Sequence, residues 1–384
     1  MAFNGQDRIP GKQKQIVEAL RTEIVTGAFR PGGQMPTQHE LVMRFGVSGM
    51  TVQHALGELV REGFLCTLPR RGTYVASDPP HLCHYGVIFH TSPSQSARWP
   101  QFWAALEREA GAMQQAGDRL LTMFYGIHGW TPGVDYQRLM EQVSRHQLAG
   151  LIFTSDPHHL VGTPLLTEPN IPRVAVAGPH CYLGVVCIRL DHDSFWQRVV
   201  ELVLRRNGRL GVLTTPTYPT EALAKFLCER GVELRPEHIQ AVSLDGAEWS
   251  RNAAQLMMLL DRRRRPDVLV VADDNLVPYA TAGIAASGVS VPGDVEVIAH
   301  CNFPWPMHSS VPVRRIGYDV RAILKACVDV IDAKRAGQTV AESVTIQATW
   351  QEELDGVPAS GAGVQAGEVS EASGIASDAG RAGV

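Results

Sequence analysis

The stretch between residues 48 and 73 carries side chains of the kinds that contact nucleic acid. It includes hydroxyl groups at Ser48 and Thr51, an amide at Gln53, and adjacent guanidinium groups at Arg70 and Arg71. Hydroxyl and guanidinium groups commonly bind phosphate oxygens, whereas a glutamine amide can form a bidentate pair with adenine. The stretch therefore predicts contact with duplex DNA.

Other groupings of reactive residues point to no comparable chemistry. His81, Cys83 and His84 stand in "HLCH", but a fourth zinc ligand at suitable spacing is missing. The segment "TSPS" is not a G-x-S-x-G elbow, and no order of Ser, His and Asp suggests a nucleophile with its base. The sequence therefore predicts no enzyme, no metal site and no cofactor.

Residues 1–75, called the head, have the pattern of three helices and a hairpin. "KQKQIVEALRTEIVTG" has apolar residues at helical spacing, and "TQHE" from Thr37 has the form of a capping box that starts a second helix toward Phe45. "FLCTL" and "TYV" flank "PRRG", which predicts a two-stranded wing with a basic tip. Ser48 should cap a third helix that buries Val52, Ala55, Leu56, Leu59 and Val60.

Residues 84–354, called the body, alternate between short apolar strands and helices. This alternation is typical of parallel sheets with helices on both faces, and the number of units predicts two sheets in two lobes. The expected strands are 85–90, 120–125, 150–155, 173–178, 185–190, 210–215, 268–273 and 295–300. The expected helices are 101–116, 134–147, 194–206, 220–230, 248–263 and 275–287.

Two segments lie outside these units. Residues 76–83 contain two prolines and are expected to form a linker. Residues 355–384 are rich in Gly, Ala and Ser with almost no large apolar residue, so a disordered tail is expected.

Charge and cysteine usage restrict the class of protein. The head has nine Lys and Arg against six Asp and Glu, a formal charge of +3, so the rest of the chain carries −7 of the total of −4. The seven scattered cysteines form no CxxC pair, which indicates reduced thiols. An apolar run of about 18 residues is absent, as is an apolar signal core near the N-terminus, so we expect a cytoplasmic protein.

The head resembles the winged helix-turn-helix of GntR-family bacterial transcription factors. The matching segments are "GAFRPGGQMPTQHEL", "FGVS-x-x-TV-x-x-AL-x-x-L-x-x-EGFL" and "RRGTYV". The body resembles the effector domain of LacI/GalR-type repressors, itself similar to type I periplasmic sugar-binding proteins, most clearly in "PDVLVVADDNLVPYATAGIAASGVSVPGDVEVIAHCNFP". The combination is similar to arabinose-repressor-like regulators. It implies an α/β fold, with a winged helix-turn-helix before a two-lobed, doubly wound parallel-sheet domain.

The resemblance implies which head residues face DNA. GntR heads generally have an arginine or a similar group where this chain has His39, Gly49 and Gln53. These departures predict a changed base preference, a lower affinity and a shallower salt dependence; the alternative is a weakened head, or one that binds through a partner. The implied DNA-binding residues are Lys14, Thr37, Gln38, His39, Ser48, Gly49, Met50, Thr51, Gln53, His54, Arg70, Arg71, Gly72 and Thr73.

The resemblance also implies a small-molecule effector, a carbohydrate or derivative, in the cleft between the lobes. Phe102, Asp191 and Asp274 are among the candidates for contact with this effector. The alternative interpretation is that Phe102 is a core residue and that Asp191 and Asp274 are helix N-caps. Sugar-responsive members usually have an aspartate at the position of Cys301 and an arginine after "LGVLTT", where this chain has "PTYPTEA". The effector is therefore expected to be less polar than a typical sugar, or the site to be vestigial. The candidate effector residues are Phe102, Trp103, Asp191, Asp274, Cys301, Asn302 and Trp305.

Together these features predict a homodimeric bacterial transcriptional regulator, a repressor that binds a pseudo-palindromic operator and responds to a ligand. A solute-binding receptor and a small-molecule-binding protein that has lost DNA binding are the alternatives.

Overall fold

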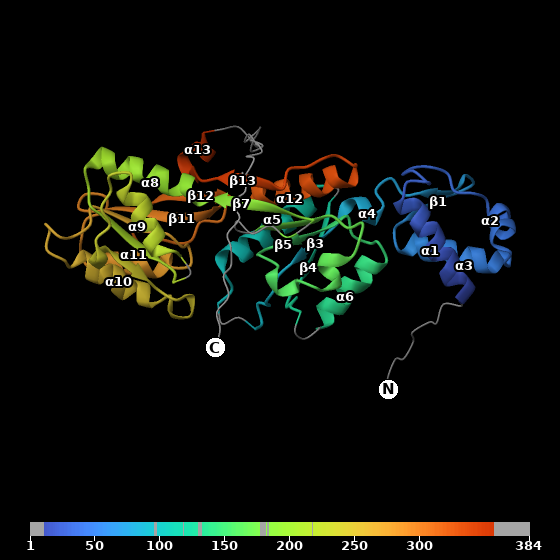
Figure 1. The fold of residues 1–384 in the computed structure, drawn as a ribbon, viewed down its shortest axis with the longest axis horizontal. Helices are drawn as coiled ribbons and strands as arrows, with labels where there is room; N and C mark the ends of the chain where they lie inside the picture. Colours follow the sequence, from blue (N-terminus) through green and yellow to red (C-terminus); the bar gives the residue numbers. More distant parts are fainter. Residues whose placement is uncertain are drawn as a thin grey trace, which may run out of the picture.

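The computed structural model describes residues 11–95, 98–117, 119–129, 133–176, 182, 184–216 and 218–356. The head lies at one end of an elongated molecule, and the two lobes of the body follow it (Figure 1). Most of the segment expected to be a tail, residues 357–384, lies outside the described residues.

The head has the three helices and the wing that its sequence predicts. Thr37 Oγ1 accepts a hydrogen bond from Glu40 N at 3.3 Å, and Thr37 N donates to Glu40 Oε2 at 2.7 Å, which is the expected capping box. Ser48 Oγ accepts from Thr51 N at 3.2 Å and caps the third helix. The elements are α1 (Gly11–Val25), α2 (Gln38–Phe45), α3 (Gly49–Arg61), β1 (Leu65–Leu68) and β2 (Gly72–Val75).

The apolar stripe of α3 is narrower than expected. Val52, Ala55 and Leu59 are fully buried, whereas Leu56 is half-buried. Val60 was expected in the core but is 36% exposed, because it lies at the margin of the stripe that packs on α1 and β1.

The body contains two six-stranded sheets, each of which forms one lobe. The first lobe has the order β13-β7-β6-β5-β3-β4, and all of its neighbouring strands are parallel. Its strands are β3 (His84–Ile88), β4 (Leu120–Phe124), β5 (Gly150–Phe153), β6 (Arg173–Val176), β7 (Val185–Asp191) and β13 (Ser343–Gln347). Its helices are α5 (Gln101–Ala116), α6 (Val134–Ser144), α7 (Pro164–Thr167) and α12 (Val320–Arg335).

The second lobe has the order β14-β12-β11-β10-β8-β9, parallel except for the pair of β12 and β14. Its strands are β8 (Leu210–Thr214), β9 (Ile239–Ala241), β10 (Val268–Val271), β11 (Glu296–Phe303), β12 (Arg314–Asp319) and β14 (Thr349–Trp350). Its helices are α8 (His192–Arg206), α9 (Thr220–Cys228), α10 (Trp249–Met258), α11 (Val277–Ala286) and α13 (Gln351–Asp355).

The chain passes between the lobes after β7, after β12 and after β13. The fold class and each expected strand and helix are present, with shifts of a few residues at their ends. The sequence analysis did not identify β9, β12, α12, β13 and β14.

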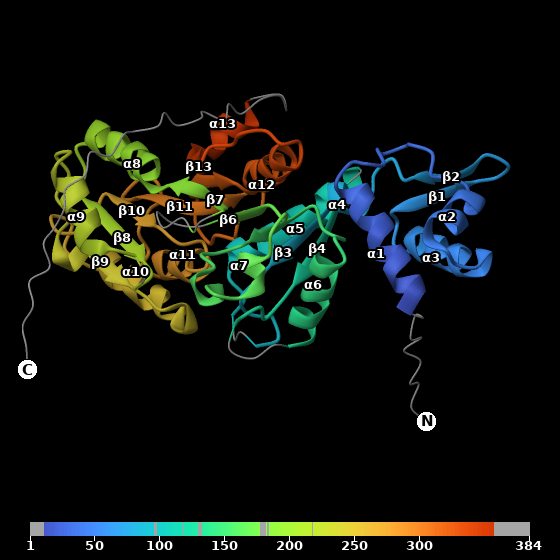
Figure 2. The same ribbon diagram turned by 45° about the vertical axis from the view of Figure 1, so that its right-hand side comes forward.

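The segment between the wing and the body packs against both. Residues expected to be a linker include the short helix α4 (Pro80–Cys83), which lies between the head and the first lobe in both views (Figure 1, Figure 2). His81 is 3% exposed, and its ring stacks on Phe64 with 5.8 Å between centroids. Burial lowers the pKa of His81 to about 4. His84 Nε2 is hydrogen-bonded to Thr122 Oγ1 at 2.8 Å rather than directed toward a shared zinc site.

A buried ion pair fixes the end of α3 to α1 and to the body. Arg21 Nη2 donates to Glu62 Oε2 at 2.6 Å, and the two side chains are 8% and 7% exposed. Arg145, which follows α6 in the first lobe, places its Nη1 3.7 Å from the other carboxylate oxygen of Glu62. One carboxylate therefore contacts a cation in the head and a cation in the body.

Removing this carboxylate should destabilise the head. Glu62→Ala leaves Arg21 buried without a counter-ion, at an expected cost of about 3–5 kcal/mol. Hydrogen exchange of the α1 and α3 amides in the full-length protein measures the local free energy of opening. The control Glu58→Ala breaks the more exposed pair with Arg61 and should cost less than about 1 kcal/mol. Equal losses of opening free energy in the two variants would contradict the role of Glu62 as the buried counter-ion of Arg21.

Candidate functional site

The outer face of the head presents most of the residues expected to contact DNA. Gln38, His39, Met50, Gln53 and His54 are exposed on α2 and α3. Lys14, Thr37, Ser48 and Gly72 are also exposed, whereas Gly49, Thr51 and Thr73 are partly covered. The arrangement therefore leaves the base-reading candidates of α3 open to a partner.

Gly49 allows α2 and α3 to approach closely. Gln38 Nε2 donates to Gly49 O at 2.8 Å, and a Cβ atom at position 49 would lie 3.1 Å from the same nitrogen. Gln38 thus braces the start of α3, and Gly49 makes room for it. A larger side chain at position 49 would require the amide end of Gln38 to shift slightly.

The wing tip carries two of the cations of the head that are available to a partner. Arg44 is paired with Glu23 and Arg61 with Glu58. Arg70 and Arg71 are exposed at the wing tip, and neither has an ion-pair partner among the residues that the structure describes. An anionic partner such as a phosphate backbone could bind them without first displacing a carboxylate.

The body contains a cavity of about 700 Å³ at the carboxyl ends of β10, β11 and β12. Helices α8 and α9 form another part of its wall, and α5 of the first lobe contributes Phe102. The described lining is Pro100, Phe102, Leu190, His192, Asp193, Phe195, Trp196, Thr215, Tyr218, Pro219, Ala222, Leu223, Phe226, Leu244, Ala272, Asp273, Asp274, Asn275, His300, Asn302 and Tyr318.

Two acidic residues follow β10 at the edge of this cavity. Asp274 and Asn302 are 3% and 2% exposed, and Asn302 Nδ2 donates to Asp274 Oδ2 at 2.7 Å. Asp273 Oδ1 accepts from the backbone and side-chain nitrogens of Asn275 at 2.9 and 2.8 Å. Asn302 Oδ1 is buried without a hydrogen-bond partner among the described residues. The edge thus presents acceptor oxygens to the cavity.

Burial controls the ionisation of this edge. Burial, together with the charge of neighbouring Asp273 and against the hydrogen bond from Asn302, raises the pKa of Asp274 to about 7. Burial also raises the pKa of Asp273. The pKa of His300 is lowered to about 4 and that of His192 is lowered as well, in both cases chiefly by burial. The two imidazoles are therefore neutral at physiological pH.

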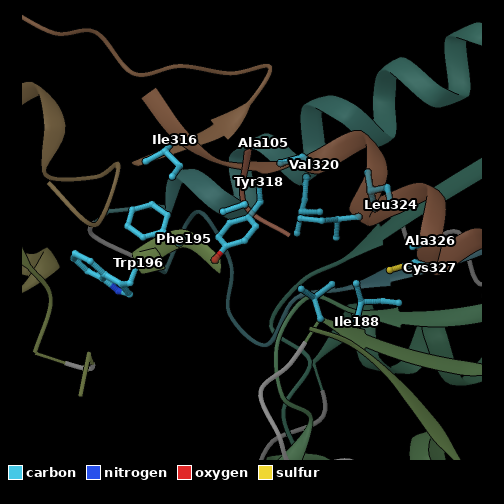
Figure 3. Packing of buried hydrophobic residues seen from close by; sticks show 14 of the residues in the cluster. Ala105, Ile188, Phe195, Trp196, Ile316, Tyr318, Val320, Leu324, Ala326 and Cys327 are labelled. Atoms are coloured by element: carbon cyan, nitrogen blue, oxygen red, sulfur yellow. The ribbon is translucent and has the colours of Figure 1, made fainter. Parts of the chain in front are cut away.

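Aromatic side chains form much of the remaining wall. Phe195 and Trp196 of α8 lie beside Tyr318 of β12 at one end of a buried cluster that continues to α12 in the first lobe (Figure 3). Tyr218 accepts a hydrogen bond from Trp196 Nε1. The cavity thus borders directly on the core that joins the lobes.

The structure brings three of the seven predicted effector residues to this cavity, namely Phe102, Asp274 and Asn302. Asp191 caps α8 by accepting from Ser194 N at 3.0 Å, which was the alternative interpretation. Trp103 packs on His90 and Phe89. Cys301 is buried, and Trp305 lies under Arg108; these four are not part of the described lining.

Sequence reasoning missed the contributions of α8 and α9. Trp196, Tyr218 and Phe226 lie in or next to amphipathic helices, where an aromatic residue is usually part of the core. The available signal was "PTYPTEA", which follows a predicted strand end and contains Tyr218.

The two lobes also touch at the cavity. Gln101 N, at the start of α5, donates to Asn275 Oδ1 at 3.0 Å. Arg98 Nη1 donates to Tyr279 Oη at 3.1 Å and is paired with Glu248. Asn275 therefore contacts both the acidic edge and the opposite lobe.

The variant Asp274→Asn should be more stable than the wild type at pH 8 and little different at pH 4. The folded-state pKa of Asp274 is raised from 3.8 to about 7, so the folded protein retains a proton that the unfolded chain releases. The wild type therefore loses stability as pH rises between these values, whereas asparagine does not. Thermal unfolding across this range measures the difference. The control Asp191→Asn preserves a helix cap outside the cavity lining. If this variant gains as much stability at pH 8, the raised pKa of Asp274 is not the cause of the gain.

Among the residues that the structure describes, no helix is long and apolar enough to span a membrane.

Comparison with known families divides the chain in the same way as its structure. Residues 12–75 match the bacterial regulatory proteins of the gntR family. Residues 205–351 match the periplasmic binding protein-like domain.

Relatives of the whole chain and of the head alone are transcriptional regulators. An arabinose metabolism transcriptional repressor of Geobacillus stearothermophilus is 23% identical over 325 residues, which cover 79% of this chain and 86% of the relative. The HTH-type transcriptional repressor NagR of Bacillus subtilis is 38% identical over 96 residues, or 25% of this chain and 39% of the relative.

The fold of the body recurs in solved structures. A LacI family transcriptional regulator from Lactobacillus casei, with bound sucrose, has a TM-score of 0.52 and 15% identity, and the match covers 70% of this chain and 98% of that one. The chain is therefore a transcriptional regulator that joins a gntR-family DNA-binding domain to a periplasmic-binding-protein-like domain.

Proposed function

We propose that this regulator is a cytoplasmic repressor that binds operator DNA as a homodimer and is controlled by a small molecule in the cavity of the body. The single observation that carries the proposal is the combination, in one chain, of an exposed α3 with a cationic wing and a cavity that both lobes line. Several of its relatives are named as repressors, including one of arabinose metabolism. Binding, rather than catalysis, is the proposed activity.

The head is proposed to place α3 in the major groove and the wing on the neighbouring backbone. Gln53 is exposed at the groove-facing side of α3 and would read adenine. Arg70 and Arg71 would contact phosphates. One small module buries limited DNA surface, so two heads on a pseudo-palindromic site supply the affinity of a specific regulator.

The effector is proposed to act by changing the arrangement of the lobes. Asn275 lines the cavity and accepts from the first residue of α5 in the opposite lobe. A ligand that contacts the acidic edge would bind one arrangement of this contact better than another, and only such a difference in affinity can shift the equilibrium.

Selection of genomic fragments by the purified full-length protein tests the proposal. A recurrent pseudo-palindrome is expected among the bound fragments. Failure to enrich any sequence at low salt would instead favour the alternative of a small-molecule-binding protein whose head no longer binds DNA.

The double variant Arg70→Ala with Arg71→Ala should weaken binding to the selected operator and to unrelated duplexes by similar factors. Phosphate contacts carry no sequence information. Their loss also makes the plot of log binding constant against log salt concentration shallower, by about two in slope. Titrations at several salt concentrations measure both quantities. The control Arg61→Ala removes an exposed cation that is already paired with Glu58 and should change the slope less. A loss confined to the operator would contradict the assignment.

Gln53→Ala should relax the preference at one base pair of each half-site, at a cost of about 1–3 kcal/mol on the operator. Repeating the selection with the variant measures this directly. Val60→Ala, at an exposed position of α3 outside the implied DNA-binding residues, is the matched substitution and should leave the motif unchanged. An unchanged motif for Gln53→Ala would show that Gln53 does not read bases.

A further inference from the structure

The described lining of the cavity contains acidic side chains but no basic Lys or Arg side chain. The acidic side chains are those of Asp193, Asp273 and Asp274. His192 and His300 do not offset the carboxylates, because burial lowers the pKa of both imidazoles. A ligand with a negative group would therefore meet like charges in a site of low dielectric constant, and such juxtaposition is costly.

The hydrogen-bonding groups at the acidic edge are mainly acceptors. Asn302 Oδ1 is buried and unpartnered among the described residues, and the Nδ2 group of the same side chain is already used by Asp274. An unsatisfied buried acceptor destabilises the empty protein, and a ligand with N–H donors that reaches it would satisfy it. The edge is thus complementary to a donor-rich group.

The rest of the cavity lining is suited to an apolar body. Phe102, Trp196, Tyr218, Phe226 and Tyr318 all line the cavity, together with aliphatic side chains of α9. A ring or a branched alkyl group would pack against these residues, and aromatic faces also attract cations. A polyhydroxylated ligand would leave several hydroxyl groups against apolar atoms.

From this arrangement we propose that the effector is a small organic cation, an amine or amidine attached to an aromatic or branched apolar body. Its N–H groups donate to Asp273, Asp274 and Asn302, and its body packs on the aromatic wall. The inference rests on the proposed function in one respect: it takes this cavity to be the effector site.

Ionisation of Asp274 should make the affinity for a cation depend on pH. Asp273 and Asn275 after β10 and Cys301 and Asn302 on β11 interact with Asp274, and Arg315 acts on Cys301. The other titratable groups of the cavity lining are Asp193, His192, His300, Tyr218 and Tyr318. A cation stabilises ionised Asp274, whose pKa in the empty protein is about 7. Affinity for a cation should therefore rise as pH increases from 6 to 8, and binding below pH 7 should release protons.

Matched probes separate charge from shape. Calorimetry with the full-length protein would compare 2-phenylethylamine, tryptamine and benzamidine with neutral 2-phenylethanol, tryptophol and benzamide. It would also include 3-phenylpropionate, L-arabinose and D-glucose. At least one cation is expected to bind about tenfold or more tightly than its neutral counterpart, since charge-assisted hydrogen bonds are roughly twice as strong as neutral ones. If no cation exceeds its neutral counterpart, or if a sugar binds more tightly than every cation, the inference is overturned.

Variants locate the preference within the cavity. Asp273→Asn and Asp274→Asn should each reduce the ratio of cation to neutral affinity, and the rise in affinity with pH should disappear in Asp274→Asn. Asp191→Asn makes the same chemical change at a helix cap outside the lining and should retain both properties. An undiminished preference in both edge variants would place cation binding elsewhere and overturn the inference.

Measurements of operator affinity with each ligand separate a failure of this inference from a failure of the proposed function. If a cation binds in the cavity but operator affinity does not change, the ligand class inferred for the cavity stands, whereas control of DNA binding by that ligand fails. If a free sugar alone binds and alters operator affinity, control by a ligand stands and the inference about a cation fails.

Discussion

The polar edge of the cavity exists because the strands of the second lobe that end there run in the same direction. Strands β10, β11 and β12 are parallel and in register, with Val271 opposite Ala299 and Asn302 opposite Tyr318. The residues at or just after their carboxyl ends must therefore meet at one edge of the sheet. The consequence is a cluster of polar groups, two of them acidic, at the edge of the cavity, where a ligand could contact them.

Residues that line the cavity also belong to the core that connects the lobes. Phe195, Trp196 and Tyr318 line the cavity and also belong to the core cluster that continues to α12 (Figure 3). Close-packed cores change between discrete arrangements rather than by continuous deformation. A ligand that moves these aromatic side chains thus acts on the joint between the lobes, and Asn275 adds a polar contact that the same movement would break or strengthen.

The sequence predicts local features of this protein well and distant pairings poorly. The caps at Thr37 and Ser48 depend on residues three positions apart, so both were found. Asp274 and Asn302 were candidates through the family resemblance, and the structure places both in the cavity lining, joined by a hydrogen bond. Helix α12 was missed although its apolar spacing is regular and eight of its residues are buried. The pair of Arg21 and Glu62 joins residues 41 positions apart, and nothing in the spacing of the two residues indicates it.

The attachment of the head determines how a signal from the cavity could reach DNA. Its described contacts with the body, through Arg145 and the surface that includes His84, Leu120 and Gln147, all involve the first lobe. The stacking of His81 on Phe64 fixes the connecting helix to the head as well. The head would therefore move with the first lobe, and closure of the second lobe alone would leave its α3 unchanged. In a dimer, the quantity that an effector can alter is the placement of the two first lobes relative to each other, because this placement sets the distance between the recognition helices.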